Sequence, residues 1–246
     1  MPYHLETIPL WEAMETESPC PLCALHEKCE ASEIERSLGG SVMEPDERIR
    51  VNEHGICGRH HQMLFEMKNR LGHALLTDSH TKETLKKLEK LDALLPGPGK
   101  RGVFGGGKTD LSALTGALEA LCSDCVICSE INVHMERYLY TFVHLWKSDG
   151  AFRQKWNQSR GLCLPHACQL LPVAQKHLSA AQQREFAQSL LSQLKTQLEQ
   201  DEKDLEWFTL KFDYRNQQKP WGNSRNALER TINRLRGRCI GGEKES

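Results

Sequence analysis

A pair of cysteine motifs that occurs twice constrains this chain more than any other feature of its sequence. Cys20-Pro21-Leu22-Cys23 recurs as Cys125-Val126-Ile127-Cys128, and Gly55-Ile56-Cys57-Gly58-Arg59-His60 recurs as Gly161-Leu162-Cys163-Leu164-Pro165-His166. Self-similarity at a fixed spacing indicates that a structural unit has been duplicated. We therefore expect two homologous repeats, one in each half of the 246-residue chain.

The residue types in these motifs are those that zinc prefers. Structural zinc takes four ligands in a tetrahedron, and cysteine sulfur and histidine nitrogen are its usual donors. Residues three apart at the start of a helix share a face and can reach one ion. We predict two zinc ions, each held by the Cys₃His set of its own repeat. The sets are Cys20, Cys23, Cys57 and His60, and Cys125, Cys128, Cys163 and His166.

The repeat also helps to separate ligands from other cysteines and histidines. Three candidates align with a residue of a different type in the other repeat, and we do not expect these three to bind metal: His61, Cys122 and Cys168. Cys29 aligns with His134, and both can ligate a metal. This pair stays open, although a buried thiol and a surface imidazole are the favoured interpretation.

The hydrophobic pattern predicts an all-α fold. Apolar residues recur at helical spacing near 7–16, from Cys23 to Leu38, from Cys57 past Leu71, from Leu85 to Leu95, near 111–121, from Cys128 to Trp146, after Cys163 and from Phe186 to Phe208. We expect a first helical unit at 1–95, a Pro/Gly-rich linker at 96–108, a second unit at 109–210 and a basic helical tail at 211–246.

The net charge of −1 gives no overall attraction to nucleic acid, but charge is unevenly distributed. Residues 1–40 carry eight acidic and two basic side chains, whereas residues 211–238 carry eight basic and two acidic ones. We favour an interaction between the two ends of the chain, within one molecule or between two. Binding of nucleic acid by the basic tail is the less favoured alternative.

The N-terminal residues lack the basic start and apolar stretch of a signal peptide, and no apolar run approaches the length of a membrane span. We therefore expect a cytoplasmic protein with no membrane association. Ten cysteines in a reducing compartment are then expected to bind metal rather than form disulfides.

Three other chemistries fit fragments of the sequence. Gly102-Val103-Phe104-Gly105-Gly106-Gly107-Lys108-Thr109 matches the phosphate-binding loop, but the Pro/Gly-rich residues before it cannot form the buried strand that this motif requires. Cys122, Cys125 and Cys128 have iron–sulfur spacing, which would leave the matched histidines unexplained. A redox dithiol expects a βαβ setting, which the helical pattern does not provide.

The chain resembles a family of uncharacterised bacterial proteins that is defined only as a domain of unknown function. The resemblance rests on His4-Leu5-Glu6-Thr7-Ile8-Pro9-Leu10-Trp11, on the first CxxC and CxxH motifs, and on Lys211-Phe212-Asp213-Tyr214-Arg215-Asn216. It covers nearly the whole chain and implies no activity. Cys122, just before the second CxxC motif, departs from the family pattern.

These observations predict a structural zinc protein that serves as an interaction scaffold. We expect no catalysis, because four protein ligands close a zinc site and no hydrolase motif accompanies the repeats. An unidentified protein or a second copy of the chain is the expected partner. The alternative function is a zinc–thiolate redox switch, in which oxidation of the sulfurs releases the metal.

Overall fold

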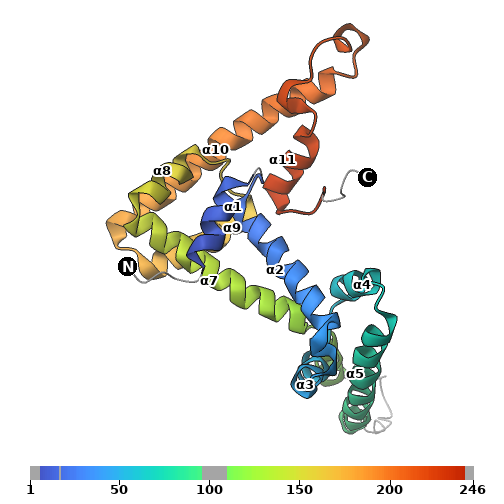
Figure 1. Cartoon of the computed structure of the whole chain (residues 1–246). Coiled ribbons are helices and arrows are strands. Elements are labelled where there is room, and N and C mark those ends of the chain that lie inside the picture. Colours follow the sequence, from blue (N-terminus) through green and yellow to red (C-terminus); the bar gives the residue numbers. More distant parts are fainter. Residues whose placement is uncertain (1–5, 17, 96–109, 242–246) are drawn as a thin grey trace, which may run out of the picture. The chain divides into compact units, whose positions relative to one another are not determined.

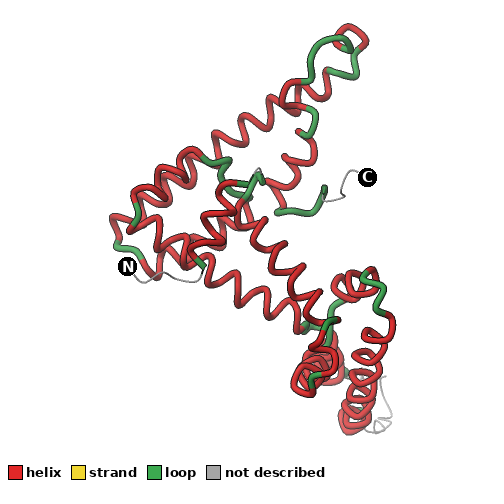
Figure 2. Tube along the Cα trace, viewed as in Figure 1, coloured by secondary structure: helices red, strands yellow, loops and turns green. Residues whose placement is uncertain are grey.

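A computed structural model describes residues 6–16, 18–95 and 110–241. In these residues it contains eleven α-helices and short 3₁₀ turns, with no strand (Figures 1 and 2). The helices are α1 (Thr7–Glu15), α2 (Pro21–Leu38), α3 (Pro45–His54), α4 (Gly58–Glu66), α5 (Arg70–Leu91), α6 (Ser112–Cys122), α7 (Val126–Ser148), α8 (Gly150–Gln158), α9 (Leu164–His177), α10 (Ala180–Leu210) and α11 (Ala227–Arg236). The predicted all-α class is confirmed.

The chain forms two compact units that do not coincide with the two sequence repeats. Unit 1 combines Met1–Lys28 with His134–Ser246, and unit 2 is the continuous stretch Cys29–Val133. The boundaries between the units fall inside α2 and α7. The linker predicted at 96–108 and the phosphate-loop match at 102–109 lie outside the described residues. The homology of the two repeats stays a prediction.

The core of unit 1 is a cluster of aromatic rings contributed by α7, α8 and α10. Phe142 of α7 makes edge-to-face contacts with Phe152 and Trp156 of α8 and with Phe186 of α10, at centroid separations of 5.2, 5.3 and 6.5 Å. All four side chains are almost fully buried. Edge-to-face pairs add to the burial of apolar area, so this cluster fixes the packing of the three helices.

A buried ion-pair network holds α11 against α10. Asp201 of α10 accepts hydrogen bonds from the Nε atoms of Arg230, at 2.7 Å, and of Arg234. Asp201 is 2% exposed and Arg234 is 1% exposed. Arg230 also reaches Asp204, at 2.6 Å. These arginines are half-way along the predicted basic tail, and their charges are neutralised inside the fold.

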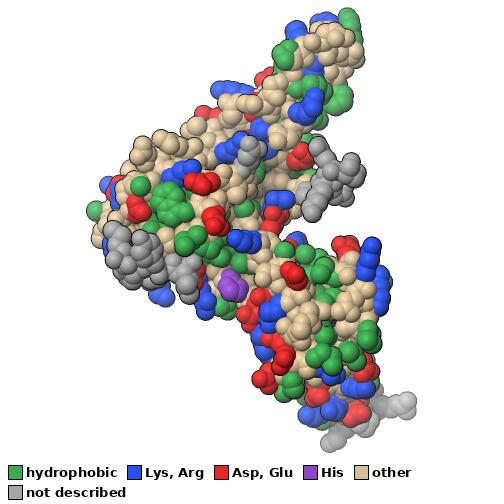
Figure 3. All heavy atoms as spheres, viewed as in Figure 1, with side chains coloured by type: hydrophobic (Ala, Val, Ile, Leu, Met, Phe, Trp, Pro, Cys, Tyr) green, Lys and Arg blue, Asp and Glu red, His purple; other side chains and the backbone are tan. Residues whose placement is uncertain are grey.

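The acidic N-terminal segment contacts the basic tail at one described ion pair, between Glu27 and Arg238. On the face that Figure 3 shows, Lys and Arg side chains are interspersed with acidic and hydrophobic ones rather than gathered in one continuous patch. This ion pair is one contact within the chain between the two oppositely charged ends.

Unit 2 is built mainly by the packing of α3 against α5, with α4 leading into α5. The sequence pattern predicted one helix from Cys57 past Leu71, and this prediction is wrong. Lys68 adopts φ 64°, which ends α4, and the Asn69 side chain accepts a hydrogen bond from the backbone N–H of Gly72, at 3.0 Å, to start α5.

Two helices were not predicted. α3 buries little besides Val51, so its hydrophobic signal is weak. α8 is short, and its two buried residues, Phe152 and Trp156, provide only one pair of apolar positions at helical spacing. Within the described residues, no single helix is long and apolar enough to cross a membrane, whereas α6 and α7, bent by 69° at their junction, pass that test as a pair.

Candidate metal centres

The eight predicted ligands come together in two clusters, but not in the predicted sets. Site 1 consists of Cys20, Cys23, Cys163 and His166, and site 2 consists of Cys57, His60, Cys125 and Cys128. The prediction that each repeat supplies its own four ligands is therefore wrong. Each CxxC motif pairs with the CxxH motif of the other repeat. Site 1 lies wholly in unit 1 and site 2 wholly in unit 2.

All four motifs use the same local geometry. The first metal-donor residue of each motif immediately precedes a helix, and the second donor residue, three positions later, lies in the first turn of that helix. The helices are α2 after Cys20, α4 after Cys57, α7 after Cys125 and α9 after Cys163. Each site is therefore formed by two helix N-termini. The first-turn N–H groups and the helix dipole favour negative charge there, which suits thiolates and lowers their pKa values in general.

Glycine makes both CxxH turns possible. Gly55 has φ 71° and Gly161 has φ 78°, in the left-handed region that other residues rarely adopt. A Cβ at Gly55 would lie 3.1 Å from His80, and one at Gly161 would lie 3.2 Å from Gln193. In unit 2 the Gly55 carbonyl also accepts a hydrogen bond from the N–H of Val126, at 3.0 Å, so it links this turn to the start of α7.

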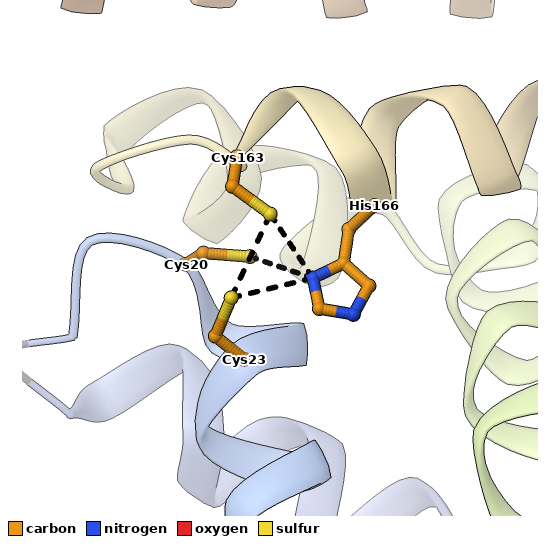
Figure 4. A group of neighbouring side chains, drawn as sticks. All are labelled: Cys20, Cys23, Cys163 and His166. Carbon is orange, nitrogen blue, oxygen red and sulfur yellow. Dashed lines mark hydrogen bonds between the residues drawn. The ribbon is translucent and has the colours of Figure 1, made fainter. Parts of the chain in front are cut away.

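Site 1 has the dimensions of a tetrahedral metal site. In Figure 4, Cys20 and Cys23 from the start of α2 and Cys163 and His166 from the start of α9 point toward one another. The Nδ1 atom of His166 lies 3.5, 3.4 and 3.1 Å from the sulfurs of Cys20, Cys23 and Cys163. The sulfurs of Cys23 and Cys163 are 3.6 Å apart. All four residues are buried.

Site 2 repeats these dimensions. The Nδ1 atom of His60 lies 3.3, 3.4 and 3.5 Å from the sulfurs of Cys57, Cys125 and Cys128. The sulfurs of Cys57 and Cys128 are 3.9 Å apart. Tetrahedral zinc bonds imply sulfur–sulfur edges of about 3.8 Å and sulfur–nitrogen edges of about 3.5 Å. The sulfur–nitrogen distances of 3.1–3.5 Å and the two sulfur–sulfur distances of 3.6 and 3.9 Å are close to these edges, although Cys57 and Cys128 are only half-buried.

Each cluster contains one thiol that ionises readily. Hydrogen bonds from Cys20 and Cys23 lower the pKa of Cys163 to about 4. Burial opposes ionisation of Cys125, but its contact with His60 prevails and lowers its pKa to about 6. Burial raises the pKa of Cys20. Each site thus provides at least one thiolate near neutral pH, the protonation state that metal binding requires.

A carboxylate supports the histidine of site 2. Burial disfavours the charged form of His60, yet Cys125 and Glu30 raise its pKa to about 10. The Nε2 atom of His60 lies 3.1 Å from an oxygen of Glu30, and Arg59 donates two hydrogen bonds to the same carboxylate, at 3.0 and 2.7 Å. Sequence reasoning missed Glu30, because Met135 occupies the matching position in the second repeat.

The other cysteines and histidines lie outside the two clusters. Cys122, Cys168 and Cys239 are exposed, and Cys29 is half-buried. His134, its match in the second repeat, is also half-buried, so neither the buried thiol nor the surface imidazole of the favoured interpretation is found. His61 contacts His73, with nitrogens 2.8 Å apart, and belongs to neither cluster.

The fold and its two sites define an all-α protein with a pair of Cys₃His clusters, each able to hold one metal ion. The chain belongs to the family of unknown function DUF6062, whose model matches residues 1–241. The predicted resemblance to a family defined only as a domain of unknown function is thereby confirmed. No curated protein and no solved structure matches the chain.

Proposed function

We propose that this protein is a structural zinc protein that binds two zinc ions, one in each Cys₃His cluster. One observation carries the proposal: four zinc-type donors converge twice with the edge lengths of a zinc tetrahedron. Four protein ligands leave no open position for substrate or water, which favours a structural role over catalysis. Cys122 lies outside site 2, which supports zinc over an iron–sulfur cluster that would recruit it.

In this proposal each ion fastens two helix N-termini that are far apart in the sequence. Site 1 joins α2 to α9, and site 2 joins α4 to α7. The result is a helical scaffold in which one ion clamps each unit, and its partner is an unidentified protein or a second copy of the chain. The turn after α10 supplies a candidate contact surface, because Phe212 and Tyr214 are 73% and 80% exposed.

Elemental analysis of protein purified without added metal tests the metal content. We expect two zinc ions per chain, with neither iron nor acid-labile sulfide. Less than half an equivalent of any metal, or iron accompanied by sulfide, contradicts the proposal. Analytical ultracentrifugation of the zinc-loaded protein then tests self-association separately from metal binding.

A redox switch is the second candidate, and the exposure of site 2 favours it. Cys57 and Cys128 are half-buried, and their sulfurs are 3.9 Å apart. Hydrogen peroxide would take two electrons from the two thiolates, which form one disulfide as the peroxide and two protons become two waters and zinc is released. Fast, reversible release of one zinc by mild peroxide, with the helical circular-dichroism signal retained, supports this function. Retention of both ions excludes it.

A further inference from the structure

Glu30 is a buried carboxylate that touches a ligand of site 2 without belonging to the cluster. It comes from α2, is 5% exposed, and is held in place by the two hydrogen bonds from Arg59. It also contacts the Nε2 atom of His60, at 3.1 Å. The opposite ring nitrogen, Nδ1, faces all three sulfurs of the cluster.

A metal-bound imidazole is neutral and carries its proton on the nitrogen that the metal does not take. A carboxylate acceptor at Nε2 fixes that proton and leaves the Nδ1 lone pair directed at the metal. It also makes the ligand nitrogen more basic and limits rotation of the ring. Loss of such an outer carboxylate typically weakens metal binding by about 10- to 100-fold.

We propose that Glu30 is a positioning residue for the metal of site 2, and that it makes the two sites unequal in how they hold their histidine. The inference rests on the proposed binding of zinc. No hydrogen bond to the Nε2 atom of His166 is present among the described residues, and Met135, the match of Glu30, has no comparable acceptor. Site 2 therefore holds its histidine with an ion-paired carboxylate, and among the described residues site 1 has no counterpart to it.

The arrangement of Arg59 strengthens this assignment. The Arg59 side chain is 63% exposed, while that of Glu30 is 7% exposed. An arginine near the surface can keep the buried carboxylate ionised and fix its orientation, and it remains hydrated if the carboxylate is removed. Removal of the carboxyl group therefore leaves no buried charge without a partner, and the variants should fold.

The test compares Glu30→Gln and Glu30→Met with the wild type. Zinc-loaded protein is equilibrated with increasing chelator, the free thiols are alkylated, and peptide mass spectrometry reports each cysteine separately. Gln keeps an acceptor oxygen without charge, and Met removes the acceptor. The chelator midpoint is the chelator concentration at which half of a given cysteine is alkylated. For Cys125 and Cys128 we expect this concentration to be highest in the wild type, lower in Glu30→Gln and lowest in Glu30→Met, with a decrease of about 10- to 100-fold overall. The midpoint for Cys20 and Cys23 should not change.

Glu33→Gln is the matched control. Glu33 lies on the same helix, is also nearly buried, and pairs with Arg36 at 2.7 Å, and it belongs to neither Cys₃His cluster. This variant should leave the chelator midpoints of site 1 and of site 2 unchanged. The nitrogen-15 spectrum of the His60 ring supplies a readout that a purely structural role would not move. We expect a protonated, exchange-protected Nε2 in the wild type and loss of that protection in Glu30→Met.

The outcomes separate the two levels of the argument. A wild-type protein that binds no metal contradicts the proposed function itself. A wild type with two zinc ions, combined with unchanged site 2 midpoints in both Glu30 variants, overturns the role of Glu30 alone. An equal decrease of the site 2 chelator midpoint in Glu30→Gln and Glu33→Gln also overturns the role of Glu30, because the effect would then be a general loss of helix stability.

Discussion

The exchange of motifs between the repeats can be tested by asking which cysteine variants act on the same ion. Cys20→Ser and Cys163→Ser each remove one of the four ligands of site 1. Cys57→Ser removes one from site 2. Each single variant should reduce the zinc content from two ions to one, because a serine hydroxyl is a poor replacement for a thiolate at a zinc site.

The effect on stability follows from linkage between binding and folding. With free zinc at about 1,000 times the dissociation constant, one site stabilises the folded protein by about 4 kcal/mol. For a chain of about this length, 1 kcal/mol corresponds to about 2–4 °C in Tm. Loss of one ion should therefore lower Tm by about 8–16 °C.

Double variants identify the pairing, because two changes at one site cannot remove the same ion twice. Cys20→Ser combined with Cys163→Ser should keep one zinc and lower Tm little further than either single variant. Cys20→Ser combined with Cys57→Ser should lose both ions and roughly double the Tm decrease. Differential scanning calorimetry at fixed free zinc measures the shifts, and elemental analysis counts the ions.

The within-repeat arrangement makes the opposite prediction for each double variant. It places Cys20 and Cys57 at one ion, and Cys163 at the other. Additive Tm decreases for Cys20→Ser with Cys163→Ser, together with retention of one zinc in Cys20→Ser with Cys57→Ser, would therefore refute the crossed pairing.

Three further predictions concern stability and thiol reactivity. Asp201→Ala leaves the buried guanidinium of Arg234 without its carboxylate, so urea unfolding should show a loss of about 3–5 kcal/mol. Asp213→Ala, which removes the carboxylate partner of the exposed Arg215, should show a much smaller loss. Gly161→Ala forces a residue with a side chain into a left-handed backbone conformation, so it should destabilise the folded protein by about 1–2 kcal/mol and weaken metal binding at site 1. Gly116→Ala, in open space on α6, should stabilise the folded protein slightly. Thermal unfolding measures both changes in stability. In the zinc-loaded protein, iodoacetamide should react quickly with the three exposed cysteines only, and a chelator should expose the six ligand cysteines; rapid labelling of ligand cysteines before chelation would contradict metal protection. The exposed cysteines are Cys122, Cys168 and Cys239.

The sequence was sufficient to find the eight candidate ligands because their signal is local. A CxxC or CxxH motif at a helix start places two donors on one face, whatever the rest of the chain does. The positions of most helices were predicted for the same reason. The break between α4 and α5 was missed, because it depends on one residue, Lys68, in an uncommon backbone conformation.

The pairing of motifs and the role of Glu30 could not be predicted, because both depend on contacts between distant segments. Glu30 is thirty residues before His60, and the second repeat offers no matching carboxylate that would have singled it out. A repeat identifies what its copies share, and Glu30 is a feature that they do not share.

Closeness in sequence is in any case weak evidence for which motifs bind one ion. Each doubling of a closed loop costs only about 0.6 kcal/mol of chain entropy. The separation of 140 residues between Cys23 and Cys163 is about two doublings longer than the separation within one repeat, which adds about 1.2 kcal/mol. Structural zinc contributes on the order of 10 kcal/mol in isolated modules, so helix packing and metal geometry decide the partners.

The crossed pairing would give the two proposed ions different structural roles. Unit 2 is one continuous stretch of chain, and an ion in site 2 would join its first third to its end. Unit 1 consists of two separate stretches, and site 1 takes Cys20 and Cys23 from the first and Cys163 and His166 from the second. In the proposed function, a metal in site 1 would therefore act as a cross-link between the N-terminal segment and the rest of unit 1, which the chain itself connects only through all of unit 2. The burial of all four residues of site 1 suits this role, since a cross-link that closes a discontinuous unit has to stay in place, whereas the half-buried sulfurs of Cys57 and Cys128 would leave an ion in site 2 the more accessible of the two.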